Sequence, residues 1–143
     1  MSTASPMLRL DPRRLDQLKA IAAATGTTST GVIAELIRAN IAAGVIGPAI
    51  PGVTVTHTPT GVAISLNDNP RTVITHDFAR RLAACIRGVV QGTEEPTIFP
   101  IEQVAVLRQG TGFKIVVPFP GSGVAFPGDL ALDLADLIEG VAK

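Results

Sequence analysis

The chain has 143 residues, and its acidic and basic side chains balance to a formal net charge of zero at pH 7. Its one cysteine, Cys85, excludes an intrachain disulfide and favours a reducing, cytoplasmic compartment. No apolar run approaches membrane-spanning length, and few aromatic residues are available to stack on single-stranded nucleic acid. We therefore expect a soluble cytoplasmic protein with no membrane partner and no tandem repeat.

The first pattern along the chain predicts a short strand followed by a helix. In residues 7–10 the side chains alternate, so Leu8 and Leu10 share one face while Met7 and Arg9 share the other. Asp11 is a typical N-cap, and Pro12 suits the first helical position because it has no backbone N–H to leave unpaired. The sequence predicts a strand that leads directly into a helix.

A second helix follows a short turn. Gly26 is suited to the left-handed conformation that often ends a helix, and Thr28 is placed to cap the next one. This second helix carries a wide apolar stripe that consists of Val32, Ile33, Leu36, Ile37 and Ile41. So short a unit cannot bury that stripe alone, and a lone strand leaves its backbone groups unpaired, so we expect a dimer.

The order of strand, capped helix, Gly-Thr-Thr turn and second capped helix resembles the ribbon-helix-helix DNA-binding family over residues 1–43. The resemblance implies a homodimer in which two N-terminal strands pair antiparallel and enter the major groove of double-stranded DNA. An ordinary edge strand beside a helical hairpin is the alternative structure.

The resemblance also implies roles for individual residues. The strand residues that would face base edges are Ser5, Met7 and Arg9. Backbone N–H groups at the start of the second helix would bind phosphate, namely those of Thr28, Ser29 and Thr30. Arg13 and Arg14 would add phosphate contacts.

The charges are distributed unevenly between the two parts of the chain. Residues 1–43 contain five basic and three acidic residues, whereas the remainder contains seven basic and nine acidic residues. A mildly basic N-terminal part joined to a mildly acidic C-terminal part fits DNA contact through the N-terminal part alone.

Residues 44–52 are rich in Gly and Pro and are expected to form a linker, after which residues 53–143 form a second domain. Two hairpins are predicted, from residues 53–58 with 61–66 and from 103–109 with 113–117, and residues 124–126 form a short strand. Thr75 is expected to cap one helix, and a second helix ends the chain. The fold class is α+β, with two helices on one face of an antiparallel sheet.

Possible catalytic and metal-binding residues in this second domain are few. His57, His76 and Cys85 invite a metal hypothesis, but we interpret them as two surface histidines and a buried structural cysteine, with no metal and no cofactor. Residues 110–112 and 121–123 are interpreted as turns, and the Arg and acidic residues of the two helices as solvated faces. No nucleophile, base and orienting group can be assembled, so we expect no enzyme.

The leading functional hypothesis is a sequence-specific DNA-binding transcriptional repressor. The second domain would add oligomerisation, a protein partner or an effector response. One alternative is an accessory DNA-binding protein for plasmid transfer or partition. Another, from a different class, is an oligomerisation or protein-interaction module that does not bind DNA.

Overall fold

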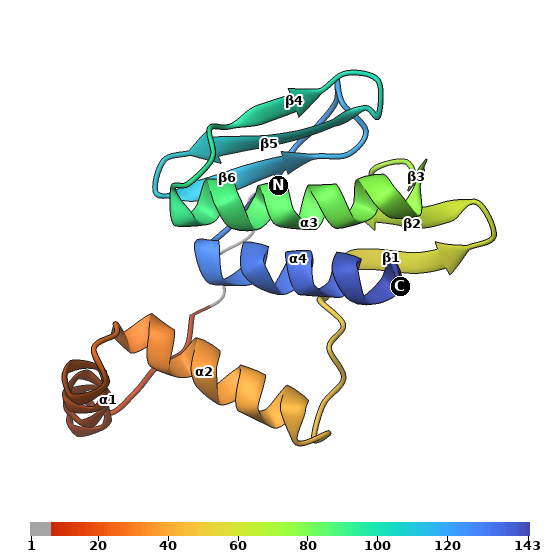
Figure 1. The fold of residues 1–143 in the computed structure, drawn as a ribbon. Helices are drawn as coiled ribbons and strands as arrows, with labels where there is room; N and C mark the ends of the chain where they lie inside the picture. The colour runs from red at the N-terminus through yellow and green to blue at the C-terminus, as the bar shows by residue number, and fades with distance from the viewer. Residues whose placement is uncertain (1–6) are drawn as a thin grey trace. The chain divides into compact units, whose positions relative to one another are not determined.

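The computed structural model describes residues 7–143, which form a mixed α+β protein with four helices and two antiparallel sheets (Figure 1). The chain divides into two compact units, Met1–Gly47 and Pro48–Lys143. The division falls within the linker predicted over residues 44–52. Each unit is described by itself.

The N-terminal unit contains helices α1 (Pro12–Thr25) and α2 (Ser29–Ala42), whose directions differ by 83°. The caps lie at the residues that the sequence indicates. Asp11 accepts a hydrogen bond from the backbone N–H of Arg13, and the Thr28 hydroxyl accepts one from the N–H of Gly31 at 3.1 Å. Between the helices, Gly26 has the left-handed conformation, with φ at 71°.

Residues 7–10 form no strand in this structure. The prediction of a strand depends on a second strand beside it, because an isolated strand has no partner for its backbone hydrogen bonds. The structure contains one copy of the chain, so this pairing is absent, and the ribbon belongs to the function proposed below.

The C-terminal unit contains two sheets in place of the single sheet that the sequence predicts. The first sheet has the order β1-β2-β3 and the second β4-β5-β6-β7, and every neighbouring pair is antiparallel. The strands are β1 (Val53–Thr58), β2 (Gly61–Leu66), β3 (Thr72–Ile74), β4 (Thr97–Phe99), β5 (Val104–Gln109), β6 (Gly112–Val116) and β7 (Val124–Phe126). Helix α3 (His76–Gln91) follows the first sheet, and α4 (Gly128–Val141) follows the second.

The two helices lie side by side and cover both sheets, so one core serves the whole unit (Figure 1). Leu82 and Ile86 of α3 and Leu134 and Ile138 of α4 are almost completely buried. Burial of one such side chain contributes about 1.5–3 kcal/mol. The two helices run antiparallel. The Arg80 guanidinium near the start of α3 accordingly donates to the carbonyl of Ala142 just after α4, at 2.9 Å.

Helix α4 repeats the sequence of α3, contrary to the expectation of no tandem repeat. When His76 is aligned with Gly128, seven of the fourteen positions of α4 are identical to α3. The identical pairs are Asp77 and Asp129, Ala79 and Ala131, Leu82 and Leu134, Ala83 and Ala135, Ile86 and Ile138, Gly88 and Gly140, and Val89 and Val141. The small and aliphatic members of this set are those that pack in the core, so both helices present the same apolar face.

The strands repeat in the same way. The hairpin of β1 and β2 closes with Thr58 opposite Gly61, and that of β5 and β6 closes with Gln109 opposite Gly112. Next to each hairpin a three-residue strand is added, with Val62 opposite Ile74 and Phe113 opposite Phe126. The C-terminal unit is therefore an internal duplication, in which each half consists of a hairpin, a third strand and a helix.

The loops at the start of the two hairpins also correspond. The N–H of Asn67 donates to the carbonyl of Gly52, and the N–H of Phe119 donates to the carbonyl of Gln103, each at 2.7 Å. Gly52 and Gln103 both have a positive φ, of 79° and 60°. The correspondence is hard to detect in the sequence because the two loops that precede β3 and β7 differ in length and share no residue type at their aligned positions.

Gly61 and Gly112 occupy equivalent positions in the two halves, but their surroundings predict unequal effects of an alanine substitution. A Cβ atom on Gly61 would lie 1.9 Å from the carbonyl oxygen of Ile74, whereas one on Gly112 would lie 3.0 Å from that of Phe126. We expect Gly61→Ala to cost about 3 kcal/mol or more and Gly112→Ala about 1 kcal/mol. Denaturant unfolding of both variants measures the difference, and equal costs would contradict the close approach at Gly61.

Candidate nucleic-acid interface in the N-terminal unit

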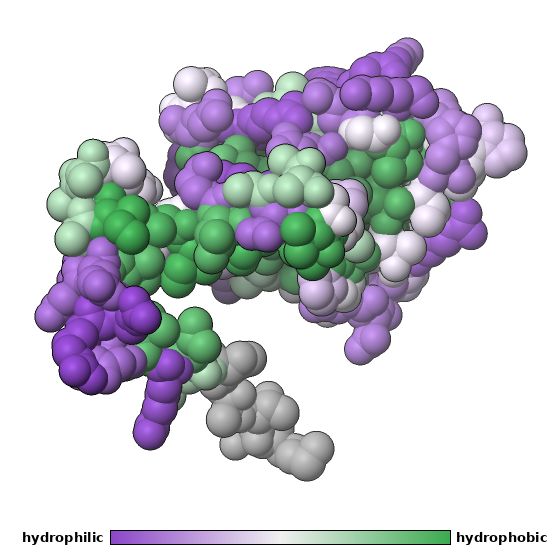
Figure 2. Space-filling model, turned by 90° about the horizontal axis from the view of Figure 1, so that it is seen from below, coloured by the Kyte–Doolittle hydropathy of each residue, from purple (hydrophilic) through white to green (hydrophobic). Residues whose placement is uncertain are grey.

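Most apolar side chains of the N-terminal unit are uncovered. Of its described hydrophobic residues only Ala22 and Ala34 are buried, and these lie on α1 and α2. Leu8 is 78% exposed and Leu36 is 63% exposed. Hydrophobic side chains are visible at the molecular surface in Figure 2, and the large exposed ones of this unit are Met7, Leu8, Leu10, Leu15, Ile21, Leu36, Ile37, Val45 and Ile46. One chain alone therefore gives this unit almost no core.

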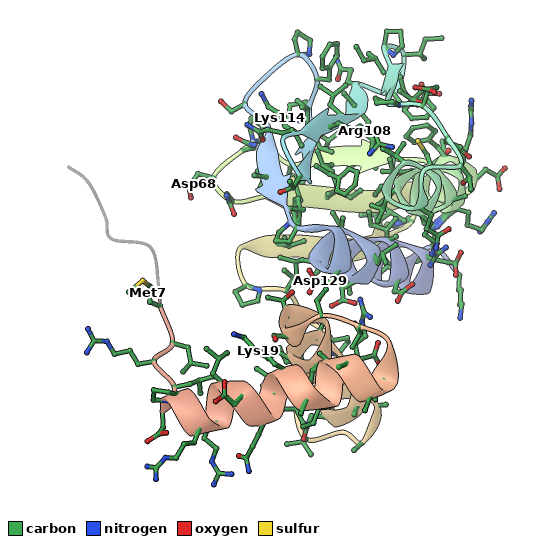
Figure 3. All side chains as sticks on the ribbon, turned by 90° about the vertical axis from the view of Figure 1, so that its left-hand side faces the viewer. Met7, Lys19, Asp68, Arg108, Lys114 and Asp129 are labelled. Carbon is green, nitrogen blue, oxygen red and sulfur yellow. The ribbon has the colours of Figure 1, made fainter. Side chains whose placement is uncertain are left out.

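The strand residues predicted to read bases lie on the segment that leads into α1. Met7 and Arg9 are both exposed, and Figure 3 shows the Met7 side chain directed away from α1. Among residues 7–143, Arg9 has no hydrogen-bond or ion-pair partner, so its guanidinium is available to an external acceptor. Ser5, the third predicted base contact, lies outside the described residues.

Arg13 is held by the N-cap of its own helix. Its Nε donates to Oδ1 of Asp11 at 2.9 Å, and its Nη2 donates to Oδ2 at 2.8 Å. These bonds lower the pKa of the Asp11 carboxyl below its ordinary value and raise the pKa of Arg13. A phosphate must displace this carboxylate before Arg13 can bind it with both nitrogens.

Arg14 lies beside this pair, and its Nη1 donates to the side-chain oxygen of Gln17 at 3.0 Å. Together these side chains line an open depression of about 300 Å³ at the start of α1, formed by Asp11, Arg13, Arg14 and Gln17. The structure thus brings the two predicted phosphate-binding arginines together at one end of α1.

The three residues predicted to bind phosphate through backbone N–H groups form the first turn of α2. The Thr28 hydroxyl already accepts from the N–H of Gly31 and lies 3.2 Å from the hydroxyl of Thr30. Within the described residues the N–H groups of Ser29 and Thr30 have no acceptor, as is usual in the first turn of a helix. They are the donors that a phosphate oxygen can use.

These two groups lie at opposite ends of α1. Fourteen residues separate the start of the helix from its end, a length of about 20 Å. Arg13 and Ser29 of one chain therefore cannot bind the same phosphate, and they would contact separate positions on a DNA backbone.

In the C-terminal unit the structure brings together two histidines that were interpreted from the sequence as surface residues. The rings of His57 on β1 and His76 at the start of α3 have centroids 4.9 Å apart and an interplanar angle of 35°. Nδ1 of His76 is buried and has no hydrogen-bond partner among the described residues. His57 is exposed and His76 is partly buried. Their contact was not predicted, because β1 and α3 are separated in sequence and meet only in the fold.

The contact between the two histidines does not create a set of metal ligands. Among residues 7–143 no group of three His, Cys, Asp or Glu side chains is arranged to hold a metal ion. Cys85 is buried, as predicted, and its burial raises the pKa of the thiol.

The expectation of a solvated face is wrong for Arg87. Its guanidinium bridges α3 to α4 by donating to Asp136 at 2.7 Å and to Glu139 at 3.0 Å. The hydrogen bond to Glu139, followed by that to Asp136, raises the pKa of Arg87 above its ordinary value. Part of the acidic row of α4 therefore has a structural role.

No single helix in residues 7–143 has the length and apolar composition needed to cross a membrane. Helices α1 and α2 reach that length and composition only when they are taken together across their 83° bend.

The Asp11 cap predicts a loss of α1 stability in acid. Because the folded pKa of Asp11 is lowered, its contribution is present above the unfolded pKa and is lost as the pH falls through the folded pKa. We expect the helical circular dichroism of the wild type to decrease below about pH 4 by more than that of Asp11→Asn, which caps without a titrating group. An equal decrease in both proteins would show that the Asp11 carboxylate does not stabilise α1.

Neither family models, curated proteins nor solved structures give a match to this chain. The proposal that follows is drawn from the residues and geometry of the N-terminal unit.

Proposed function

We propose that the protein is a homodimer that binds double-stranded DNA in a sequence-specific manner through its N-terminal unit. The observation that carries the proposal is the incompletely buried apolar stripe of α2, together with an unpaired segment at residues 7–10 in the same unit. A second copy supplies what both features lack, an apolar surface for the stripe and a strand partner for the segment.

The dimer places a suitable side chain in the major groove. When residues 7–10 pair with the same residues of a second copy, Leu8 and Leu10 face the helices, while Met7 and Arg9 face outward. A two-stranded ribbon fits the major groove, and an arginine can donate two hydrogen bonds to O6 and N7 of guanine. The unpartnered guanidinium of Arg9 supports this role.

Backbone contacts would position the ribbon. The free N–H groups of Ser29 and Thr30 lie at the positive end of the α2 dipole, where a phosphate is favoured. Arg14 adds charge at the start of α1. Two such sets in a dimer give symmetric anchors on either side of the groove.

We propose transcriptional repression as the biological role, with the plasmid-accessory role as an alternative that uses the same contacts. Selection of genomic fragments with purified protein separates the two, because the recovered sites lie either at promoters or at a transfer or partition locus. Failure to enrich any fragment at low salt would favour the oligomerisation module without DNA binding.

The first prediction of this proposal concerns the dimer. Leu36→Asp places a charge in the predicted interface and should cost several kcal/mol, so that the dimer dissociates. Ala42→Asp adds the same charge to the same helix off the apolar stripe and should leave the dimer intact. Analytical ultracentrifugation of both variants measures this, and a wild-type chain that sediments as a monomer would contradict the proposal.

The second prediction concerns base recognition. Arg9→Ala should lose roughly 1–3 kcal/mol per half-site on the selected duplex and little on a scrambled one. Arg13→Ala should weaken binding to both duplexes about equally and by less, because Asp11 already neutralises Arg13. Titration by fluorescence anisotropy at several salt concentrations distinguishes these patterns. Equal losses on both duplexes for Arg9→Ala would show that residues 7–10 do not read sequence.

A further inference from the structure

The free edges of the two sheets differ in how well they are protected. Three of the four edge strands, β3, β4 and β7, have only three residues. So short a strand offers few backbone groups to another strand. The fourth edge strand, β1, has six residues, and like the other three it contains no charged residue and no proline.

The composition of β1 favours pairing with another strand. Its sequence is Val-Thr-Val-Thr-His-Thr, in which five of the six residues are β-branched. Val53 and Val55 are partly buried on the core side, whereas Thr54 and Thr56 are exposed on the other side. Among the described residues β1 pairs with β2 alone, so one row of its backbone groups has no strand partner.

The duplication shows what occupies the equivalent edge in the second half. There β4 pairs with β5, with Thr97 opposite Val106 and Phe99 opposite Val104. The positions that correspond to β4 in the first half are residues 46–48, Ile-Gly-Pro, which lie in the linker. Gly47 weakens a strand and Pro48 has no N–H to donate, so this segment cannot cover β1 as β4 covers β5.

We propose that β1 pairs antiparallel with β1 of a second copy, so that the two first sheets of a dimer join into one. The inference rests on the proposed function, because the N-terminal units bring the two copies together. It identifies the second contact in that dimer.

Several features identify a second copy as the occupant. A strand that pairs with itself about a two-fold axis places valine opposite valine or histidine on the core side, and threonine opposite threonine on the other side. No like charges meet, although the C-terminal parts are net acidic. The linker of nine residues spans up to about 30 Å, which keeps the second β1 at a high effective concentration once the N-terminal units have paired.

Cysteine cross-linking of the full-length chain tests the contact. A chain that carries Thr54→Cys and Thr56→Cys has opposed cysteines in every two-fold register centred on residue 54, 55 or 56. Both positions are exposed and lie on the solvent side, so the fold is retained, which circular dichroism checks. The matched control is Ala125→Cys, an exposed position on the edge strand β7, and the native Cys85 is buried.

We expect mild oxidation to convert the Thr54→Cys, Thr56→Cys chain to a covalent dimer at least about tenfold faster than the Ala125→Cys chain. Sedimentation of the same samples under reducing conditions separates the two proposals. A dimer in which both chains cross-link equally slowly overturns the β1 contact and leaves the N-terminal dimer standing. A monomer with slow cross-linking overturns both.

Discussion

The need to cover apolar surface determines how this chain is organised. In the C-terminal unit each half consists of a small sheet and one amphipathic helix. Neither half has enough surface of its own to bury its apolar side chains. Packing α3 against α4, over both sheets, closes the two faces on each other, and small residues such as Ala83 and Ala135 let the helices approach closely. The Arg87 bridge to Asp136 and Glu139 adds a polar contact at the rim of this packing.

The same requirement is unmet in the N-terminal unit of a single chain. Its caps and turn define two good helices, yet local signals of this kind stabilise helix ends and do not supply a core. The duplicated unit covers its apolar faces inside one chain, whereas we propose that the N-terminal unit covers its apolar stripe by pairing with a second chain. This contrast explains why we place dimerisation, and with it DNA recognition, in the first part of the protein.

Helix caps and hairpin ends could be predicted from the sequence, whereas the pairing of strands far apart in the chain could not. The caps at Asp11, Thr28 and Thr75 and the ends of both long hairpins follow from short-range patterns, which the structure reproduces. Of the three strands with three residues only β7 was predicted, because so short a segment shows little periodicity. The split into two sheets depends on pairing partners far apart in the chain. The hydrogen bonds between Asp11 and Arg13 in the candidate interface, and the contact of His57 with His76 in the C-terminal unit, could be found only from side-chain positions.

The left-handed turns at Gly52 and Gln103 bear on how the two halves diverged. A Cβ atom on Gly52 would lie 2.7 Å from the side-chain oxygen of Asn67, whereas the matching turn in the other half already accepts a glutamine with φ at 60°. A side chain at position 52 would thus need the Asn67 side chain to move as well as a left-handed backbone. Equivalent turns of the two halves therefore differ in the side chains they accommodate, although the halves share one topology.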